Sequence, residues 1–402
     1  MGLIVQKYGG SSVKDAERVM NVARRITDTY KQGNNVVVVV SAQGDTTDEL
    51  IEKANEINPN ASKREMDMLL ATGEQISISL LAMAIEKLGF PVISLTGWQA
   101  DVKTDSHYGA ARISKIGAER LQSELDKKRI VIVAGFQGIN KYDDITTLGR
   151  GGSDTSAVAL AAALHADMCE IYTDVDGVYT SDPRFVKNAY KLDDISYDEM
   201  LEFASLGANV LHNRSVEMAK KYHVKLSVRS SLNNNEGTIV KEVDEVEKMI
   251  VRGVTRDNDC ARIALCGVED APGKAFQVFR LLAKNKIAVD LIIQSIGNGV
   301  QKDISFTVPE SDLDATLALL EENKAMIKAN EVKSTKDVSK VSIVGAGMMN
   351  NTGVAATMFE ALSDAQINIS MIATSEIKIS VLVDQKEAER AVVAIHDKFM
   401  LN

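Results

Sequence analysis

The most informative part of the sequence is LIVQKYGGSS, residues 3–12, where a short apolar run leads directly into a glycine-rich turn. A second glycine-rich turn, GRGGSDT at residues 149–155, stands directly before an alanine-rich helical pattern at residues 157–164. Glycines let backbone N–H groups approach a ligand closely, and the N–H groups at a helix start favour anions. Each turn also carries one cation and several hydroxyls. Two such turns facing each other predict a phosphoryl-transfer site for a nucleotide and a small anionic acceptor.

Short Val/Ile-rich runs alternate with helical patterns through the first part of the chain. Continuous apolar runs predict strands that are buried on both faces, and hence an α/β fold with a mostly parallel sheet covered by helices. In such sheets ligands collect at the carboxyl ends of the strands, where the polar motifs of this chain stand. The expected strands are residues 3–5, 36–40, 92–95, 130–134 and 170–173, the expected helices include 16–31, 65–88 and 157–164, and the polar motifs are 7–12, 41–48, 135–138 and 173–179.

The character of the sequence changes after about residue 240. A charged stretch, KEVDEVEK at residues 241–248, is typical of a solvated linker. Beyond it the sequence repeats itself at an offset of 80 residues: Gly273 matches Gly353, and Leu282 matches Leu362. Each copy has the pattern strand, glycine-containing loop, amphipathic helix and strand, which predicts two similar small α+β units. The predicted domains are residues 1–240, a linker with a first strand at 241–258, and the two small units at 259–337 and 338–402.

Composition limits the possible functions. The 402 residues suffice for two or three domains, and the net charge of −10 argues against nonspecific nucleic-acid binding. Three cysteines without metal spacing predict reduced packing residues, as in a cytoplasmic protein. The five histidines show no ligand spacing, so no protein-built metal site is expected. We expect no membrane span and no signal peptide, because no apolar stretch appears long enough and the N-terminus begins with a strand pattern.

The motifs together resemble those of aspartate kinases. Residues 7–13 (KYGGSSV) resemble the opening signature of that family, and residues 64–74 (REMDMLLATGE) resemble a second signature. The paired units after residue 250 resemble the family's ACT regulatory domains. The resemblance covers essentially the whole chain. It is to the monofunctional bacterial aspartate kinases, which have the amino acid kinase fold. Three further motifs carry it: SAQGDTTDEL at 41–50, TLGRGGSDT at 147–155 and YTDVDGVY at 172–179.

This resemblance implies a reaction. The γ-phosphate of ATP would pass to the β-carboxylate of L-aspartate, giving 4-phospho-L-aspartate and ADP. This is the first step of lysine, threonine, methionine and diaminopimelate biosynthesis. The expected cofactors are ATP and Mg²⁺, the metal being held mainly through the ATP phosphates. The acceptor carboxylate is already ionised at neutral pH, since a carboxyl of this kind has a pKa of about 3.9, and no general base is required.

The resemblance also assigns roles to residues. Lys7 would bridge the transferring phosphate, Arg150 would grip the α-carboxylate of aspartate, and Glu74 would accept from its α-ammonium. Asp154 either orients Lys7 or contacts the hydration shell of the metal. The expected catalytic residues are Lys7, Arg150 and Asp154; the substrate-binding residues are Thr47, Glu74, Arg150, Gly151, Gly152 and Ser153; the nucleotide-binding residues are Lys7, Tyr8, Gly9, Gly10, Ser41, Thr173, Asp174, Tyr179, Arg184 and Asn209.

Some of these residues also have ordinary interpretations. A glutamate such as Glu74 is usually a solvated helix residue, and only the surrounding motif favours a binding role. Ser153 and Thr155 are typical helix caps before Ala157. Many family members carry a lysine at the position of Asn209, which implies weaker nucleotide binding or compensation by Arg184 or magnesium.

The ACT-like units imply feedback inhibition by lysine, threonine or both, and a homo-oligomer. Asp290 and Glu376 are expected to hold ammonium groups of the effectors. Met249 opens the regulatory part, and an internal start there would yield a separate small regulatory subunit. The expected effector-binding residues are Asp270, Ala271, Pro272, Gly273, Asp290 and Gln294 in the first unit, and Asn368, Ile369, Ser375 and Glu376 in the second.

Three other interpretations compete with this one. Another amino-acid or carbamate kinase would share the fold, but the motif around Glu74 and the paired units disfavour it. A ligand sensor with a decayed kinase domain is suggested by Asn209 and opposed by the intact Lys7, Arg150 and Asp154. A nicotinamide oxidoreductase is disfavoured because residues 7–12 lack the G-x-G-x-x-G spacing.

Overall fold

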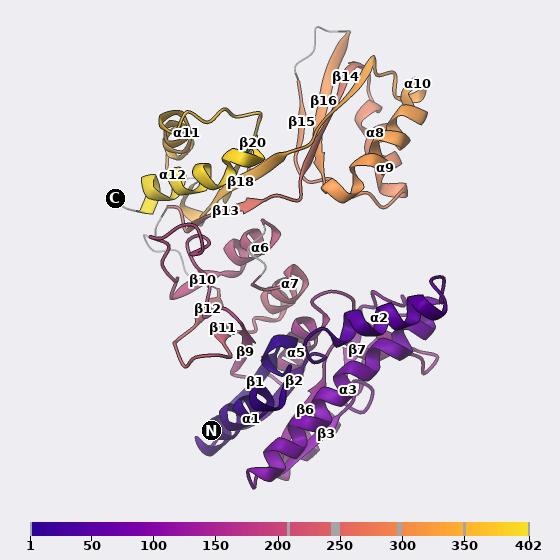
Figure 1. The fold of residues 1–402 in the computed structure, drawn as a ribbon, viewed down its shortest axis with the longest axis vertical. Helices are drawn as coiled ribbons and strands as arrows, with labels where there is room; N and C mark the ends of the chain where they lie inside the picture. The colour runs from indigo at the N-terminus through magenta and orange to yellow at the C-terminus, as the bar shows by residue number, and fades with distance from the viewer. Residues whose placement is uncertain (1, 207–209, 243–249, 296–299, 349–350, 401–402) are drawn as a thin grey trace. The chain divides into compact units, whose positions relative to one another are not determined.

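The computed structural model describes residues 2–206, 210–242, 250–295, 300–348 and 351–400 (Figure 1). The chain divides into two compact units. The first comprises Met1–Val178, Lys191–Ala204 and Asn209–Glu245, and the second comprises Tyr179–Tyr190, Ser205–Ala208 and Val246–Asn402.

The first unit is built on an eight-stranded sheet in the order β10-β12-β11-β9-β1-β2-β6-β3. Every neighbouring pair in it is parallel except β11 with β12. The α/β prediction is therefore confirmed, and all five expected strands are present. The strands are β1 (Leu3–Tyr8), β2 (Asn35–Val40), β3 (Val92–Leu95), β6 (Ile130–Ala134), β9 (Met168–Thr173), β10 (Asp194–Ser196), β11 (Leu226–Ser230) and β12 (Thr238–Lys241).

Helices cover both faces of this sheet because its central strands are apolar on both sides. Val36, Val38 and Val40 of β2 pack in one cluster with residues of α1 (Ala16–Lys31) and α3 (Lys63–Lys87). Successive strand residues point to opposite faces, so Val37 and Val39 face the other side, where α5 (Gly152–Ala163) packs. Figure 1 shows α1 and α3 side by side over the sheet. The remaining helices of this unit are α2 (Thr46–Ile57), α4 (Glu119–Asp126), α6 (Tyr197–Ser205) and α7 (Asn213–Tyr222).

A small second sheet in the same unit leads the chain into the second glycine-rich turn. Its order is β5-β4-β7-β8, and β8 ends at Thr147, three residues before Arg150. The strands are β4 (Val102–Thr104), β5 (Ile113–Ile116), β7 (Gln137–Ile139) and β8 (Ile145–Thr147).

The second unit contains the predicted repeat. Its two four-stranded sheets have the orders β15-β16-β14-β17 and β19-β20-β18-β13, which correspond strand by strand. Gly273 and Gly353, matched in the sequence, are the N-caps of equivalent helices with φ of 89° and 103°. The elements are β14 (Ala261–Glu269), α8 (Lys274–Lys284), β15 (Ile292–Gln294), β16 (Gln301–Val308), α9 (Leu313–Glu322), α10 (Lys324–Ile327) and β17 (Glu331–Thr335), then β18 (Val338–Val344), α11 (Val354–Asp364), β19 (Met371–Thr374), β20 (Lys378–Asp384) and α12 (Ala388–Met400).

The fourth strand of the second small sheet comes from an earlier part of the chain. β13 (Gly253–Asp257) pairs with β18 from Gly253↔Val344 to Asp257↔Lys340, so residues 261–335 are inserted between two neighbouring strands of one sheet. The strand expected after the charged linker therefore completes the second repeat. Residues 243–249, which include most of that linker and Met249, lie outside the described part of the chain.

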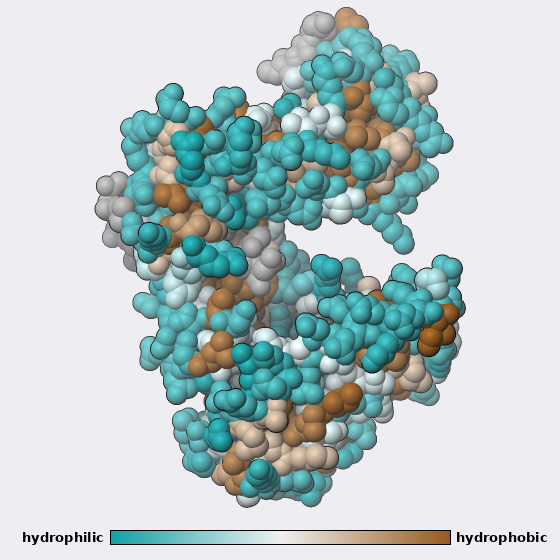
Figure 2. Space-filling model, in the orientation of Figure 1, coloured by the Kyte–Doolittle hydropathy of each residue, from teal (hydrophilic) through white to brown (hydrophobic). Residues whose placement is uncertain are grey.

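Helix α3 qualifies the expectation that no apolar stretch is long enough to span a membrane. Its 25 residues are long and apolar enough by length and composition, although half of the most apolar window is buried inside the protein. The helix also carries two buried carboxyl groups, Asp67 and Glu74. Ile76, Leu80 and Met83 are partly exposed on it, and Figure 2 shows apolar patches along this helix. Because α3 packs against α1 and the main sheet, we interpret it as a core helix.

Candidate active site

The two glycine-rich turns are joined by an ion pair. Lys7 lies on β1 and Asp154 in the first turn of α5, and their charged atoms Nζ and Oδ1 are 2.6 Å apart. Each side chain is only 12% exposed. The pair therefore holds the Lys7 ammonium at the carboxyl end of β1, beside the start of α5.

The first turn fits closely against the loop that follows β2. A Cβ on Gly10 would lie 2.6 Å from the carbonyl oxygen of Ala42, so only glycine fits here. The Ser41 N–H donates to the Tyr8 carbonyl at 3.1 Å, and the Gly44 N–H donates to the Gly10 carbonyl at 3.1 Å. This packing fixes the backbone of Gly9 and Gly10 next to Ser41. The Tyr8 side chain is fully buried and stacks on Tyr172, so its backbone is the part that can face a ligand.

The second turn differs from its expected form. Helix α5 begins at Gly152 rather than at Ala157, and its N-cap is Gly151 with φ of 67°. Ser153 and Thr155 therefore lie inside the first helical turn. Their residue types predicted helix caps, and that prediction is wrong. The expected cap is replaced because Gly151 adopts the left-handed conformation that starts the helix earlier. The exposed Arg150 immediately precedes this helix start, where N–H groups and the helix dipole favour anions.

Glu74 is a buried carboxyl group with half of its hydrogen-bonding capacity unused. It lies on α3 with 3% exposure, and its Oε1 accepts from the Ala42 N–H at 3.0 Å. Its Oε2 is buried without a partner. Burial raises the pKa of Glu74 from 4.5 to about 7. A bound cation would pair the free oxygen and favour the ionised form.

Two further predicted substrate residues lie near these groups. Ser153 of α5 is close to the end of β6, because a Cβ on Gly135 would be 2.7 Å from Ser153 Oγ. Thr47 is in the first turn of α2, and α2 packs against α3, the helix that carries Glu74. The structure thus brings the Lys7, Asp154, Ser153 and Glu74 regions to the carboxyl ends of β1, β2 and β6.

The predicted nucleotide residues fall in different parts of the molecule. Thr173 ends β9, and its hydroxyl donates to Asp174 Oδ1 at 2.9 Å in the first unit. Tyr179 and Arg184 belong to the second unit. The Arg184 guanidinium donates to both carboxylate oxygens of Asp182 and lowers the pKa of that carboxyl. Asn209 lies outside the described residues.

The predicted effector residues of the first small unit are already partly engaged. The Lys302 ammonium pairs with Asp270, and the buried Lys340 pairs with Asp290 and, at 3.3 Å, with Asp257. The residues Ala271, Pro272 and Gly273 form the loop that starts α8. The partly or fully exposed residues are Gln294, Asn368, Ile369, Ser375 and Glu376.

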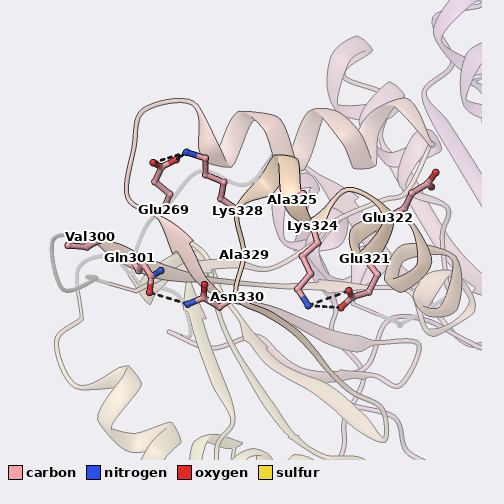
Figure 3. Close-up of a pocket in the computed structure, with 10 residues that line it drawn as sticks. All are labelled: Glu269, Val300, Gln301, Glu321, Glu322, Lys324, Ala325, Lys328, Ala329 and Asn330. Carbon is pink, nitrogen blue, oxygen red and sulfur yellow. Dashed lines mark hydrogen bonds and ion pairs between the residues drawn. The ribbon is translucent and has the colours of Figure 1, made fainter.

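An open hollow on the first small unit collects a different set of residues. Figure 3 shows that Lys328 pairs with Glu269, Lys324 with Glu321, and Asn330 with Gln301. These side chains satisfy one another, and none of the predicted effector residues lines the hollow. We therefore do not assign a ligand to it.

Sequence reasoning missed several residues that build this site. Asp67 and Arg214 bind the backbone around the second turn, and Gly135 allows Ser153 to approach β6. Gly135 stood in a polar motif already noted, and Asp67 stood in the motif at residues 64–74 without a role being assigned to it, whereas Arg214 gave no recognisable signal. Their partners are 42 to 103 residues away in the chain.

Comparison with known proteins identifies the family. A family model for the amino acid kinase family matches residues 2–230, and one for the ACT domain matches residues 263–323 and 341–399. The chain belongs to the amino acid kinase family. An aspartokinase from Bacillus sp. (strain MGA3) is 52% identical to this amino acid kinase over 403 residues, covering 100% of this chain and 98% of the relative. The resemblance drawn from the motifs is thus confirmed, and the chain is a phosphotransferase with aspartokinase homologues over its full length.

Solved structures agree with this assignment. The crystal structure of E. coli aspartokinase III in complex with aspartate and ADP matches this amino acid kinase with a TM-score of 0.83 and 26% identity, covering 100% of both chains. The same enzyme in complex with lysine and aspartate matches with a TM-score of 0.80 and 26% identity, covering 99% of both.

Proposed function

We propose that this chain transfers the γ-phosphate of ATP to the β-carboxylate of L-aspartate, giving 4-phospho-L-aspartate and ADP. The observation that carries the proposal is the buried Glu74 carboxyl, whose Oε2 has no partner and is available to accept from a bound ammonium group. Glu74 is bonded to Ala42, and Ala42 packs against the glycine turn beside Lys7. The carboxyl that would bind the ammonium group and the turn that would bind phosphate thus both contact the Ala42 loop, as a site for an amino-acid acceptor and ATP would require. The aspartate and ADP bound to E. coli aspartokinase III support the same pair of ligands.

Substrate recognition would use both ends of the aspartate backbone. Glu74 would accept from the α-ammonium, and Arg150 would hold the α-carboxylate with two parallel hydrogen bonds. Thr47, Ser153 and the N–H groups of Gly151 and Gly152 would orient the acceptor. The β-carboxylate then needs no activation by a base, because it is already ionised.

Catalysis would depend on alignment and on charge neutralisation. Lys7 is held in place by Asp154 and would stabilise the charge on the phosphoryl group, together with the N–H groups of Gly9, Gly10 and the α5 start. Bound Mg²⁺ would neutralise charge on the phosphates. Among the described residues there is no cluster of three or more His, Cys, Asp or Glu that could hold a metal, so the phosphates would supply most of its ligands. The other proposed nucleotide contacts are Tyr8, Ser41, Thr173, Asp174, Tyr179, Arg184 and Asn209.

Regulation is the second part of the proposal. Lysine, threonine or both would bind at the ACT units through Asp270, Ala271, Pro272, Gly273, Asp290, Gln294, Asn368, Ile369, Ser375 and Glu376. The lysine complex of E. coli aspartokinase III supports an amino-acid effector. Such an effector inhibits only if it binds an inactive state more tightly than the active one. The enzyme would act in the cytoplasm as a homo-oligomer, at the first step of lysine, threonine, methionine and diaminopimelate synthesis, with a further small subunit if translation starts near Met249.

An acceptor panel tests this function. ADP release would be measured with ATP and Mg²⁺ in the presence of L-aspartate, L-glutamate, N-acetyl-L-glutamate or carbamate. We expect release with L-aspartate only, suppressed by lysine, threonine or their combination. Release with another acceptor would replace the substrate assignment. Calorimetric binding of lysine or threonine without any kinase activity would instead favour the sensor interpretation.

A further inference from the structure

We propose that Asp67 is a positioning residue that fixes the Arg150 loop for aspartate binding. The inference rests on the proposed function, because it takes Arg150 and Glu74 as the groups that bind the two ends of the amino acid. It extends that function to a residue that does not contact the substrate.

Asp67 lies in the interior of the first unit and is fully buried. Its two carboxylate oxygens accept three donors, one from the loop at Gly109 and two from Thr147 at the end of β8. The Gly109 N–H is 3.0 and 2.9 Å from the two oxygens, the Thr147 N–H is 3.0 Å from Oδ2, and the Thr147 hydroxyl is 2.6 Å from Oδ1. A buried carboxylate is retained only when such donors replace water. Two of these donors belong to Thr147, directly before the second glycine-rich turn.

Thr147 transmits this anchor to Arg150. The carbonyl of Thr147 accepts from the Ala111 N–H at 2.9 Å, and the Leu148 N–H donates to the Phe136 carbonyl at 2.8 Å. From the other side, Arg214 donates to the carbonyls of Leu148 at 2.9 Å and Ala111 at 2.8 Å. The chain is therefore held firmly up to two residues before Arg150.

The anchor matters because the turn itself has little stiffness. Gly149 and Gly151, which flank Arg150, have φ of 76° and 67°. Glycines lose more conformational freedom on ordering than other residues, so the position of Arg150 depends on contacts at the ends of the turn. Asp67 supplies the contact at the N-terminal end of the turn, where it binds Thr147 at the end of β8.

Asp67 and Glu74 are on the same helix, seven residues apart, and both are buried. Residues separated by two helical turns lie on one face. Helix α3 thus holds the group that would bind the α-ammonium and anchors the loop that would bind the α-carboxylate. Its rigidity sets the distance between the two, which the fixed geometry of an α-amino acid requires.

Substitutions of Asp67 test this role. Asp67→Ala removes all three bonds, and we expect the KM for aspartate to rise about ten- to a hundred-fold, because a displacement of about 1 Å can cost that much. The KM for ATP should stay within about two-fold, since Lys7 and the first turn do not depend on Asp67. Asp67→Asn should restore the KM for aspartate to within about three-fold of wild type, because one amide oxygen can accept both N–H groups while the amide donates to the Thr147 hydroxyl. Thr147→Val removes one bond of three and should give an intermediate KM.

Glu124→Ala is the matched control. Glu124 is another buried carboxylate of the first unit, held on α4 by Arg120, Lys127 and Arg129. Its loss should lower the thermal unfolding midpoint without changing the KM for aspartate. If Asp67→Ala behaves in the same way, or raises both KM values equally, the positioning role is wrong. If Asp67→Ala does not fold, Thr147→Val with a wild-type KM for aspartate also overturns it. Arg150→Ala separates the two proposals, because an unchanged KM for aspartate in that variant contradicts the proposed function itself.

Discussion

Two carboxyl groups on α3 show why residue type alone predicts so little at this site. A glutamate on a helix is usually solvated, yet Glu74 is buried with one oxygen unpaired. Asp67 is buried in the same helix, but its three donors come from residues far along the chain. The sequence predicted that Asp154 either orients Lys7 or contacts the hydration shell of the metal, and the ion pair is the first of these. The prediction was possible because both residues stand in recognisable turns. Motifs therefore located the ionic groups of the site, while long-range packing decided which others belong to it.

The pKa of Glu74 leads to a prediction on pH dependence. The ionised form of Glu74 would bind the α-ammonium, and burial raises the pKa of Glu74 in the free enzyme to about 7. The kcat/KM for aspartate should therefore rise with pH through about 7, since this parameter reports the free enzyme. In Glu74→Gln the kcat/KM for aspartate should be low and should not rise with pH near 7. A pH profile of the variant that retains the transition would assign it to another group.

The same shift has a consequence for stability. A carboxyl whose pKa is raised by folding stabilises the folded chain below about pH 4.5, and this contribution is lost as the pH rises through about 7. Glu74→Gln should therefore reduce the decline in stability between these pH values. Urea unfolding at pH 5 and pH 8 measures this, and an equal decline in both proteins would contradict the assignment.

Lys7 gives the second prediction at this scale. Lys7→Ala should lower kcat about a hundred-fold or more, because it removes the cation that would stabilise the phosphoryl group. Circular dichroism should show a folded protein. Lys31→Ala, which removes an exposed lysine of α1, is the control and should keep wild-type kinetics. A kcat near wild type in Lys7→Ala would remove Lys7 from the catalytic role.

At the scale of elements, the strands and helices of the first unit were predicted better than the start of α5. Continuous apolar runs identify buried strands directly, as for β3 and β6, whose bounds were predicted without error. The sequence GSDTS is typical of a helix cap, and it led to an expected start at Ala157 instead of Gly152. The reason is Gly151, whose left-handed backbone and contact with His212 are properties of the folded site.

Alanine substitutions at Gly151 and Gly33 distinguish the effect of backbone strain from the effect of a steric clash. In Gly151→Ala the new Cβ would lie 2.2 Å from His212 Cγ at a φ of 67°, so we expect loss of aspartate kinase activity together with reduced stability. In Gly33→Ala the φ of 89° gives similar strain, but nothing lies within 4 Å of the Cβ. That variant should lose about 1 kcal/mol of stability with unchanged kinetics. Steady-state kinetics and urea unfolding of both proteins measure the difference; equal kinetics would show that the contact at Gly151 is not required.

For the whole molecule, the 80-residue repeat predicted two similar small units, and the matching sheets and helix caps confirm it. The sequence could not show that β13 completes the second small sheet, because strand pairing depends on residues about 90 positions apart. Nor could it show that residues 179–190 pack in the second unit. In that unit Val186 packs in the hydrophobic core, and the Thr180 hydroxyl is hydrogen-bonded to Nε2 of the buried His396 at 2.9 Å. Tyr179 and Arg184, proposed for nucleotide binding, thus lie in a segment that belongs to the second unit.

Asp290 allows a prediction on regulation. Asp290→Ala should raise the concentration of lysine or threonine that gives half-inhibition by about ten-fold, a typical coupling magnitude, while uninhibited activity stays constant. Lys340 keeps its contact with Asp257 in this variant, which limits damage to the fold. Asp314→Asn, a change at a highly exposed carboxylate in the same unit, is the control. Unchanged inhibition curves in Asp290→Ala would exclude Asp290 from the effector site.

Trapping of the acyl phosphate would show directly whether the β-carboxylate of aspartate receives the phosphoryl group. The protein would be incubated with ATP, Mg²⁺, L-aspartate and hydroxylamine, and the product would be identified by mass spectrometry. We expect β-aspartyl hydroxamate in an amount equal to the ADP released, formed about a hundred-fold or more slowly by Lys7→Ala. ADP release without hydroxamate, or hydroxamate formed at the α-carboxyl group, would contradict phosphoryl transfer to the β-carboxylate of aspartate.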